Sequence, residues 1–332
     1  MRNRQIVLVE APKGKAGPEH FRIVEGAVPE PRDGEVLLKV CLISLDAANR
    51  AWMQGATYRS AVEAGSVMAG GAIAEVVTSR ARDFSPGDLV FADTGWQDYA
   101  ALAAQALSKV PRIEPMTHLL SVYGIAGLTA YFGLLRIGRP QGGETVVVSA
   151  AAGSVGSFVG QIAKLKGCRA VGIAGGAAKC DWLEKELGFD AAVDYKAGSV
   201  YETLKAAAPS GIDVYFDNVG GDILEACLPR MNVRGRIVCC GAVSAYDAAA
   251  PAAGPRGVPG LIVIKRLLMQ GFIVTDYFNE RQAAVAELQH WVQTGQLKIE
   301  EDVIQGLENT PKALIGLLAG ENRGTRMVRV SD

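Results

Sequence analysis

Residues 144–166 read ETVVVSAAAGSVGSFVGQIAKLK. The apolar, β-branched run Glu144–Ala150 predicts a buried strand, and Val155–Lys166 has the apolar spacing of a helix. The turn between them has the spacing A-x-x-G-x-x-G, with an alanine where the first glycine of a dinucleotide-binding loop often stands. Gly153 would let the backbone approach a pyrophosphate, and Gly156 would allow close helix–strand packing. The stretch predicts a nucleotide-binding unit; the alternative is a glycine-rich turn without a ligand.

Strands and helices continue to alternate as far as about residue 295. Continuous apolar strands between helical segments predict a parallel sheet that is covered on both faces. The expected strands are Arg169–Ala174, Ile212–Asp217 and Gly235–Cys240, and the expected helices are Ala178–Leu187 and Asp222–Leu228. Further on, the sequence predicts a surface loop at Tyr246–Gly260, a short helix at Leu261–Met269, a last strand at Phe272–Thr275 and a closing helix at Arg281–Thr294.

The first 121 residues or so have a different pattern, in which short apolar or alternating runs are separated by Gly, Pro and Asp. The expected strands are Gln5–Val9, Glu35–Ile43, Met68–Val77 and Asp88–Ala92. Many short strands with such turns predict a barrel or a distorted sandwich. The tail Glu301–Val330 has a strand–helix–strand pattern and is expected to return to this first domain. The predicted domains are therefore residues 1–122 with 296–332, and residues 123–295.

Composition excludes several classes of function. The chain has 332 residues, 49% of them hydrophobic, and a net charge of −1, so no global charge attracts it to nucleic acid or to an anionic membrane. Its apolar stretches are far shorter than the roughly 18 residues of a membrane-spanning helix, and no signal peptide is visible. The six cysteines form no CxxC pair, and there are three histidines. This pattern indicates reduced thiols, a cytoplasmic location and no His-rich metal site, with the adjacent Cys239 and Cys240 buried as apolar residues rather than forming a redox switch.

The strand after the nucleotide loop indicates which cofactor binds. It ends Ile173-Ala174-Gly175-Gly176, without the acidic residue that binds the ribose 2′-OH of NAD. Lys179 follows, and a small Gly-Gly pocket beside a cation fits a 2′-phosphate. We therefore expect NADP(H) rather than NAD(H); the alternative for Lys179 is an exposed lysine at the start of a helix.

The chain lacks the residues of a zinc-dependent alcohol dehydrogenase. Such enzymes hold a catalytic zinc with Cys and His, and often a structural zinc with four clustered cysteines. At the corresponding places this sequence reads Ile43-Ser44-Leu45-Asp46 and Gly65-Ser66-Val67. Without a Lewis acid an alkoxide is hard to form. Hydride addition to an activated C=C bond is easier, because the conjugated carbonyl accepts the charge as an enolate.

Several further motifs, taken together, are specific. They are Ser44-Leu45-Asp46 with Asn49-Arg50, Gly127–Leu134, Val193–Lys196, Phe216–Gly221, Cys240–Ser244 and Gly320–Gly324. With the nucleotide loop they resemble the zinc-independent medium-chain dehydrogenases/reductases over nearly the whole chain. The similar subgroup contains leukotriene B4 dehydrogenase/prostaglandin reductase, alkenal double-bond reductase and curcumin reductase.

The resemblance implies an α/β fold in which a GroES-like β-barrel domain, made from both ends of the chain, joins a central Rossmann domain that binds NADP(H). It implies that Gly153, Ser154, Val155 and Gly156 hold the pyrophosphate, and that Lys179 and Tyr195 hold the 2′-phosphate. The residues implied around the rest of the cofactor are Asn218, Cys240, Gly241, Ala242, Val243, Ser244, Tyr246, Phe272, Ile273, Val274, Thr275 and Asn322. The family is usually homodimeric, with the Rossmann sheets joined through a strand near Phe272–Thr275.

The activity that the resemblance implies is hydride transfer from C4 of NADPH to the β-carbon of an α,β-unsaturated ketone or aldehyde. An enolate forms, and water or a tyrosine protonates the α-carbon. Tyr246 is the first candidate for binding the carbonyl oxygen and Tyr58 the second, and Asn49 could donate a hydrogen bond to the substrate or the nicotinamide. The alternatives are surface tyrosines and a buried structural asparagine. The ribose 2′-OH could also be the donor, in which case no side chain is essential.

The sequence departs from the family near the substrate. Many relatives have Asp-Pro-Tyr-Met-Arg where this chain has Asp46-Ala47-Ala48-Asn49-Arg50, and a tyrosine that some relatives carry near the position of Lys265 is absent. The substrate pocket therefore cannot be carried over. Two other functions remain open. One is a quinone reductase of the zeta-crystallin type, which shares the fold and lacks zinc, and the other is an NADPH-binding scaffold or sensor without turnover.

Overall fold

The computed structural model describes residues 2–248 and 254–331. It divides the chain into two compact units: unit 1 contains residues 1–120 and 301–332, and unit 2 contains residues 121–300. The sequence analysis expected the corresponding boundaries at 122/123 and 295/296. Among the described residues, every helix is too short or too polar to cross a membrane.

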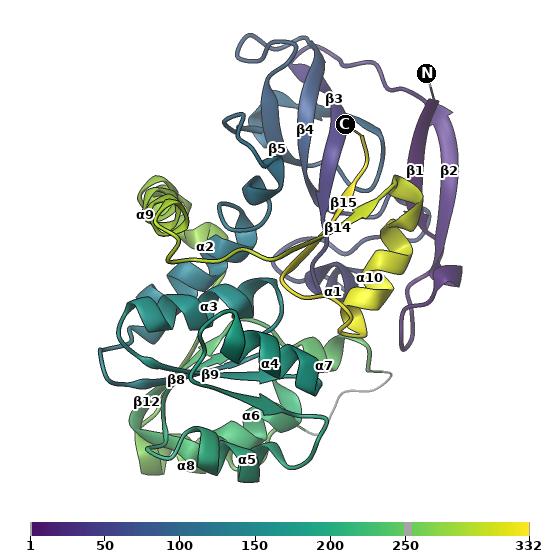
Figure 1. The fold of residues 1–332 in the computed structure, drawn as a ribbon. Coiled ribbons are helices and arrows are strands. Elements are labelled where there is room, and N and C mark those ends of the chain that lie inside the picture. The colour runs from purple at the N-terminus through teal and green to yellow at the C-terminus, as the bar shows by residue number, and fades with distance from the viewer. Residues whose placement is uncertain (1, 249–253, 332) are drawn as a thin grey trace. The chain divides into compact units, whose positions relative to one another are not determined.

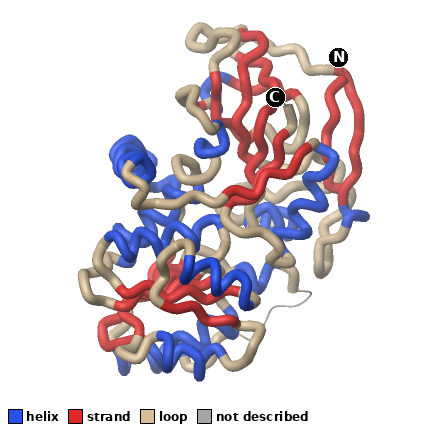
Figure 2. Tube along the Cα trace, in the orientation of Figure 1, coloured by secondary structure: helices blue, strands red, loops and turns tan. Residues whose placement is uncertain are grey.

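Unit 1 is built mainly of β-strands (Figures 1 and 2). In its described residues one sheet runs in the order β14-β15-β3-β4-β5-β7, with β6 paired to β3, while β1 and β2 pair with each other. The strands are β1 (Arg2–Leu8), β2 (Phe21–Ala27), β3 (Glu35–Ser44), β4 (Gly71–Ser79), β5 (Leu89–Asp93), β6 (Tyr99–Ala103), β7 (Ser108–Lys109), β14 (Glu301–Gln305) and β15 (Thr325–Arg329). Since β15 pairs antiparallel with β3, the C-terminal tail returns to the unit formed by the first 120 residues.

The central strand β3 organises the core of unit 1. Val40 and Ile43 pack in one apolar cluster with residues of helices α1 (Ala48–Gln54) and α10 (Thr310–Leu318), and Val36 and Leu38 pack in another. Residues on both faces of β3 are therefore buried, which explains why its sequence reads as a continuous apolar run.

One strand of unit 1 starts later than the sequence suggests. The run from Met68 was expected to be a strand, but β4 begins at Gly71. The N–H group of Met68 donates instead to Ile6 O, and Met68 O accepts from the N–H group of Trp96. The apolar character of Met68 therefore reflects burial beside β1 rather than a place in β4.

Unit 2 contains, in its described residues, a six-stranded parallel sheet with helices on both faces. Helices α3 and α4 lie on one face, and α5, α6 and α8 lie on the other (Figure 1). The strands, in the order in which they lie, are β10 (Ala191–Asp194), β9 (Arg169–Ala174), β8 (Thr145–Ser149), β11 (Ile212–Asp217), β12 (Met231–Cys239) and β13 (Leu268–Gly271). The helices are α2 (Ile125–Phe132), α3 (Ser154–Leu165), α4 (Ala177–Lys185), α5 (Val200–Ala207), α6 (Gly221–Cys227), α7 (Val243–Tyr246), α8 (Val258–Lys265) and α9 (Arg281–Gln293).

The strand order confirms the predicted doubly wound sheet. Chain order runs outward from β8 through β9 to β10, then returns to β11 on the other side of β8. In sheets of this kind, ligands bind where the order reverses, outside the carboxyl ends of the strands. The ends of β8 and β11 are therefore the place to look for a functional site.

The prediction of a last strand at Phe272–Thr275 is wrong. The strand is β13, which ends at Gly271, and Val274 opens a 3₁₀ turn. The Phe272 ring packs against the ring of Phe216, 6.4 Å between centroids, and close to Gly133. Its apolar character reflects this packing at the end of β11 and not a place in the sheet.

The connection before β13 is also different from the prediction. The expected helix Leu261–Met269 is α8, which starts at Val258 and ends before Arg266, a residue with a left-handed backbone at φ 50°. Leu268 and Met269 belong to β13 instead. The predicted surface loop Tyr246–Gly260 is wrong at both ends, since Tyr246 belongs to α7 and residues 258–260 belong to α8. Residues 249–253 lie outside the described residues.

Candidate functional site

The nucleotide loop is shaped by contacts that exclude larger side chains. Helix α3 starts at Ser154, directly after Gly153, and Ala150 has a left-handed backbone at φ 49°. A Cβ on Gly156 would collide with Ala150 O, so only glycine fits there. Val155 lies in the first turn of the helix, which has 12 residues and presents its first N–H groups at the end of β8, where an anion binds favourably.

Tyr195 and Lys196 lie over Gly175 at the carboxyl end of β9. A Cβ on Gly175 would come within 2.9 Å of Tyr195 Cε1 and Cζ, and of Lys196 Cε. Lys196 Nζ lies 5.9 Å from the centroid of the Tyr195 ring. Lys179 lies in the first turn of α4, directly beyond the same loop, and its N–H group donates to Gly176 O. The structure thus places Lys179 in the helix that follows β9 and Tyr195 directly after the neighbouring strand β10, with a second lysine, Lys196, beside Tyr195.

The acidic residue of this cluster, Asp194, is held by backbone donors. Its Oδ1 accepts from the N–H groups of Gly176, at 2.8 Å, and Lys196, at 2.9 Å. These two bonds lower the pKa of Asp194. The carboxylate therefore fastens the loop after β10 to the loop after β9. Lys196 was not among the predicted site residues, although its position directly after Tyr195 in the Val193–Lys196 motif was an available signal.

Asn218 lies at the carboxyl end of β11, beside the point where β8 enters the nucleotide loop. Its side-chain Nδ2 donates to Ser149 O at 2.8 Å, and its backbone N–H donates to Ser149 Oγ at 3.0 Å. Both residues are buried. Asn218 is thus fixed at the place where the strand order reverses.

The segment after β12 lies on the turn that follows β11. The N–H groups of Cys240 and Gly241 donate to Asp217 O at 2.8 and 3.1 Å, and Ser244 Oγ donates to Val219 O at 2.6 Å. Ala242 and Val243 lie between these anchored residues. The residues expected to line the cofactor after β11 and β12 are therefore hydrogen-bonded to each other in one connected group.

Tyr246 ends helix α7, and its hydroxyl oxygen accepts the N–H group of Ala242 at 3.4 Å. The nearby cysteines are protonated at neutral pH. Burial and, secondarily, the charge of Asp217 raise the pKa of Cys240 to about 12 and that of Cys239 to about 11. These values argue against a reactive thiolate and so against a redox switch. The expectation that both cysteines are buried is wrong, because each is only partly buried.

Two candidate catalytic residues lie in unit 1, and their surroundings differ. Asn49 is 1% exposed; its Oδ1 accepts the Asp46 N–H at 2.8 Å and its Nδ2 donates to Ala69 O at 3.0 Å. Tyr58 is 60% exposed, with its ring edge-on to Trp52 at 6.3 Å. Asn49 therefore holds the turn before α1 in place, whereas most of the Tyr58 side chain is exposed to solvent.

Asn322 also lies in unit 1, where its Nδ2 donates to Gly324 O at 2.9 Å. The other predicted cofactor residues lie in unit 2, in the segments that follow the carboxyl ends of its strands. Lys265, where some relatives carry a tyrosine, donates to Pro229 O and Met231 O and so joins α8 to the start of β12.

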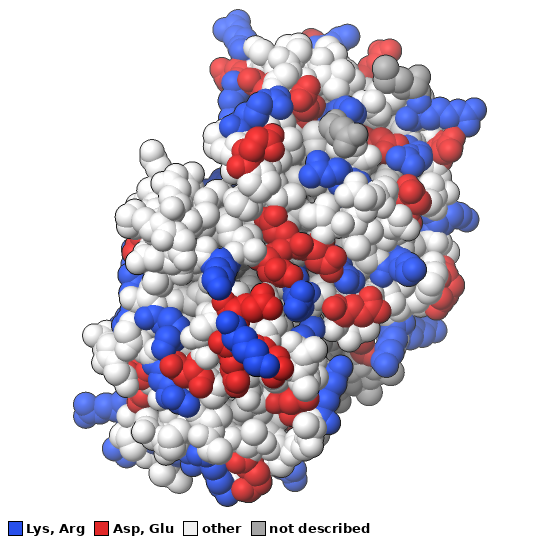
Figure 3. Space-filling model, in the orientation of Figure 1, with Lys and Arg blue, Asp and Glu red and all other residues white. Residues whose placement is uncertain are grey.

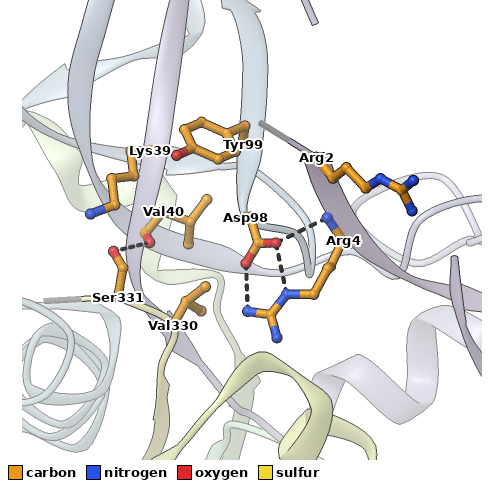
Figure 4. Close-up of a pocket in the computed structure, with 8 residues that line it drawn as sticks. All are labelled: Arg2, Arg4, Lys39, Val40, Asp98, Tyr99, Val330 and Ser331. Carbon is orange, nitrogen blue, oxygen red and sulfur yellow. Dashed lines mark hydrogen bonds and ion pairs between the residues drawn. The ribbon is translucent and has the colours of Figure 1, made fainter. Parts of the chain in front are cut away.

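A pocket of about 330 Å³ in unit 1 contains none of the predicted site residues (Figure 4). Its lining residues are Arg2, Arg4, Lys39, Val40, Asp98, Tyr99, Val330 and Ser331. Arg4 Nε and Asp98 Oδ2 form an ion pair at 2.9 Å within it.

Positive and negative side chains are interspersed on the face shown in Figure 3. That face offers no extended surface of one sign.

Metal-ligating side chains do not cluster in the part of the chain that the structure describes. No group of three or more His, Cys, Asp or Glu side chains there is arranged to hold a metal ion. Asp46 accepts a hydrogen bond from Ser44 Oγ at 3.1 Å. Burial raises the pKa of Asp46.

Comparison with known proteins gives matches in both halves of the chain. Residues 4–110 match a family described as the N-terminal domain of oxidoreductase, and residues 154–290 match one described as zinc-binding dehydrogenase. NADPH-dependent curcumin reductase of Escherichia coli is 43% identical, with 99% of this chain and 97% of that protein covered. Prostaglandin reductase 1 of Bos taurus is 44% identical, with 93% of each chain covered.

A solved structure agrees with these matches. The crystal structure of CurA from Vibrio vulnificus in complex with NADPH is similar to this chain with a TM-score of 0.94 and 41% identity. The similarity covers 99% of each chain. The predicted fold class, a Rossmann sheet with a GroES-like domain, is thereby confirmed.

Proposed function

This chain belongs to the medium-chain dehydrogenase/reductase family, in the group that includes curcumin reductase and prostaglandin reductase, and we propose from this that it uses NADPH to reduce the C=C bond of α,β-unsaturated ketones or aldehydes. The observation that carries the proposal is the full-length similarity to an NADPH-dependent curcumin reductase. The glycine loop at the end of β8 and the cluster of Tyr195 with two lysines at the end of β9 support it.

The adenine half of NADPH would lie over the loops after β9 and β10. Lys179 and Tyr195, and in addition Lys196, would surround the 2′-phosphate, because two ammonium groups and a phenol suit a dianion. Gly175 lets the Tyr195 ring and Lys196 pack there, since a side chain on residue 175 would collide with both. The pyrophosphate would bind at Gly153–Gly156, against the start of α3.

When bound, NADPH supplies the hydride for the β-carbon of the substrate, and the conjugated carbonyl accepts the resulting charge. The protein's part is to orient the two reactants and to place a hydrogen-bond donor at the carbonyl oxygen. Tyr246 is our first candidate for that donor, because it follows the Cys240–Ser244 segment and its hydroxyl group lies within hydrogen-bonding distance of the Ala242 N–H. Tyr58 is the second, because it is largely exposed. Asn49 would act mainly by holding the turn before α1.

We propose that this chemistry proceeds without zinc. The sequence has Ser44 and Asp46, and Ser66, where zinc-dependent relatives carry ligands, and these residues do not make a Cys/His donor set. The description of one matched family as zinc-binding therefore does not extend to this chain's residues. All six cysteines are free, which supports a reducing compartment such as the cytoplasm.

We also propose a homodimer joined through the outer strand β13. Among the described strands β13 pairs with β12 alone. Its Leu268 is 40% exposed, and on the neighbouring helix α8 Val263 is 72% and Ile264 67% exposed. An open strand edge beside exposed apolar side chains is typical of a surface covered by another subunit. Ile264→Glu should then halve the mass measured by light scattering, whereas Ile23→Glu, at an exposed site in unit 1, should leave it unchanged. An unchanged mass for Ile264→Glu would contradict this interface.

The position of the transferred hydrogen tests the proposed reaction. With NADPH that carries deuterium at C4 and a phenyl-substituted enone, NMR of the product should show deuterium on the β-carbon of the saturated ketone. Deuterium on the carbonyl carbon would indicate alcohol formation instead. Turnover of quinones alone, or NADPH binding without turnover of any acceptor, would point to the quinone reductase or to the scaffold.

A further inference from the structure

One carboxylate oxygen in unit 2 accepts hydrogen bonds from four described donors. Asp217 is 2% exposed, and its Oδ1 accepts from Tyr215 OH at 2.9 Å and Ser149 Oγ at 3.2 Å. The backbone N–H groups of Val219, at 3.0 Å, and Gly220, at 2.8 Å, donate to the same oxygen. A buried carboxylate is costly unless hydrogen-bond donors replace its lost hydration, and these four donors do so.

These bonds connect loops that follow three different strands. Ser149 is the last residue of β8 and directly precedes the nucleotide loop. Val219 and Gly220 form the turn after β11, where Gly220 has a left-handed backbone at φ 70°. Through its backbone oxygen, Asp217 also accepts the first two N–H groups of the segment after β12. One residue therefore sets the relative positions of the loops that follow β8, β11 and β12.

The cofactor's direction across the sheet follows from the site already described. If the 2′-phosphate lies at the end of β9 and the pyrophosphate at the end of β8, the other half of the dinucleotide must extend over β11 and β12, across the reversal of strand order. The loops that Asp217 connects would then lie beside the nicotinamide. Asp217 itself is buried beneath them.

We propose that Asp217 is a positioning residue for hydride transfer. It holds the turn after β11 and the segment after β12 in the positions that the nicotinamide ring requires. The inference rests on the proposed function, because it assumes that NADPH lies along the loops described. Asp217 does not touch the reactants. Its effect would come through Asn218, Val219 and Gly220, and through the Cys240–Ser244 segment.

A second aspartate on the same strand provides a matched control. Asp213 lies at the opposite end of β11, where its Oδ2 accepts the Thr145 N–H and its Oδ1 accepts from Asn232, both at 2.8 Å. It also joins neighbouring strands through its carboxylate, but at the end of the sheet away from the nucleotide loop. If the carboxylates at both ends of β11 were purely structural, replacing either of them would change the stability of the protein and nothing else.

The test compares Asp217→Asn, Tyr215→Phe and Asp213→Asn with the wild-type enzyme. Asp217→Asn keeps an acceptor oxygen but replaces the carboxylate with a neutral amide, and Tyr215→Phe removes the phenol group that donates to Asp217 Oδ1 and also hydrogen-bonds to Ser149. The readouts are kcat and KM for NADPH, fluorescence titration with 2′,5′-ADP, which reports the adenine half alone, and hydrogen exchange of the peptide spanning residues 217–224 in the protein without cofactor.

We expect Asp217→Asn to lower kcat about tenfold or more, since small misplacements of reacting groups cost up to about 100-fold. Tyr215→Phe should lower it less, by about threefold. Binding of 2′,5′-ADP should change by less than about twofold in both variants, while exchange in residues 217–224 should become faster. Asp213→Asn should lower the melting temperature and leave kcat and exchange at residues 217–224 unchanged.

Either of two results would overturn the inference. One is a normal kcat in both Asp217→Asn and Tyr215→Phe; the other is a loss of 2′,5′-ADP binding equal to the loss of activity, which would mean that the whole site is disturbed. If Asp217→Asn fails to fold, Tyr215→Phe decides the question. If the wild type turns over no enone, the proposed function fails, and the exchange measurement alone decides whether Asp217 holds the loop.

Discussion

The ring of Tyr195 lies directly over Gly175, so closely that a Cβ on Gly175 would come within 2.9 Å of two ring carbons. The two residues follow neighbouring parallel strands, β10 and β9. Their contact means that the glycine at the end of β9 is required by the tyrosine and not only by a ligand. It also fixes the place where Tyr195 and Lys196 can meet a phosphate.

Gly175→Ala should therefore weaken NADPH binding by displacing the Tyr195 ring. We expect KM for NADPH to rise about tenfold, the size of a lost charge-assisted hydrogen bond, and KM for NADH to change little. Steady-state kinetics with both cofactors measure this. Gly198→Ala, at a site with nothing within 4 Å of the added Cβ, is the control. Equal losses for the two cofactors would show that Gly175 matters for the fold and not for the phosphate.

Replacement of either lysine should reduce the preference for NADPH. Lys179→Met and Lys196→Met each remove one cation from the expected phosphate site, and each should reduce the ratio of kcat/KM for NADPH to that for NADH by about 10-fold. The effect of each substitution on this ratio should become smaller at high salt, because exposed charges are screened. Lys185→Met, further along α4, should have no effect on the ratio. A preference that survives both Lys179→Met and Lys196→Met together would mean that the phosphate is bound elsewhere.

Ala150→Gly should stabilise the protein. Ala150 has a left-handed backbone, at φ 49°. This conformation has a higher free energy for a residue with a Cβ than for glycine. The expected gain in free energy of unfolding is about 0.5–1 kcal/mol, after subtraction of the entropy that glycine loses on folding. Thermal or urea unfolding measures it. Ala178→Gly, in helix α4, should have the opposite sign, with a loss of about 1 kcal/mol. A destabilised Ala150→Gly would show that the Ala150 side chain contributes packing that outweighs the strain.

The carboxylate of Asp194 should make a pH-dependent contribution to stability. Hydrogen bonds from the N–H groups of Gly176 and Lys196 lower its pKa below the ordinary value of 3.8. A lowered folded-state pKa stabilises the fold above the unfolded-state pKa, and that contribution disappears as the pH falls through the folded-state pKa. The wild type should therefore unfold at a higher temperature than Asp194→Asn near pH 7. The difference should shrink once the pH falls below 3.8 and vanish when it is below the folded-state pKa. A difference that grows on acidification, or that also appears with Asp222→Asn, would contradict the assignment.

The parts of the fold that follow from hydrophobic periodicity were predictable. The β8–turn–α3 unit was expected within one residue at each end, since an apolar run, a glycine turn and a helical pattern follow one another without interruption. Phe272 was wrongly predicted to lie in a strand, because aromatic residues have a high strand propensity and its packing partner Phe216 is far away in the sequence. Long-range packing of this kind leaves no local pattern.

The candidate site was predictable to a similar degree. The motif at Val193–Lys196 indicated Tyr195, but nothing local showed that the ring lies on Gly175, or that Lys196 joins it. For Asn49 the sequence could not separate a catalytic from a structural side chain, and only its bonds to Asp46 and Ala69 assign the structural part of its role. Residue identity predicts which chemistry is available, whereas tertiary contacts determine which atoms remain free to use it.

The most direct test of the central claim is the loss of NADPH absorbance with four acceptors: a 2-alkenal, a phenyl-substituted enone, a quinone and a saturated ketone. Each acceptor is tested again with NADH in place of NADPH. The account predicts turnover of the first two acceptors, none with the saturated ketone, and a strong preference for NADPH over NADH. Turnover of the quinone alone, or equal rates with NADPH and NADH, would contradict it.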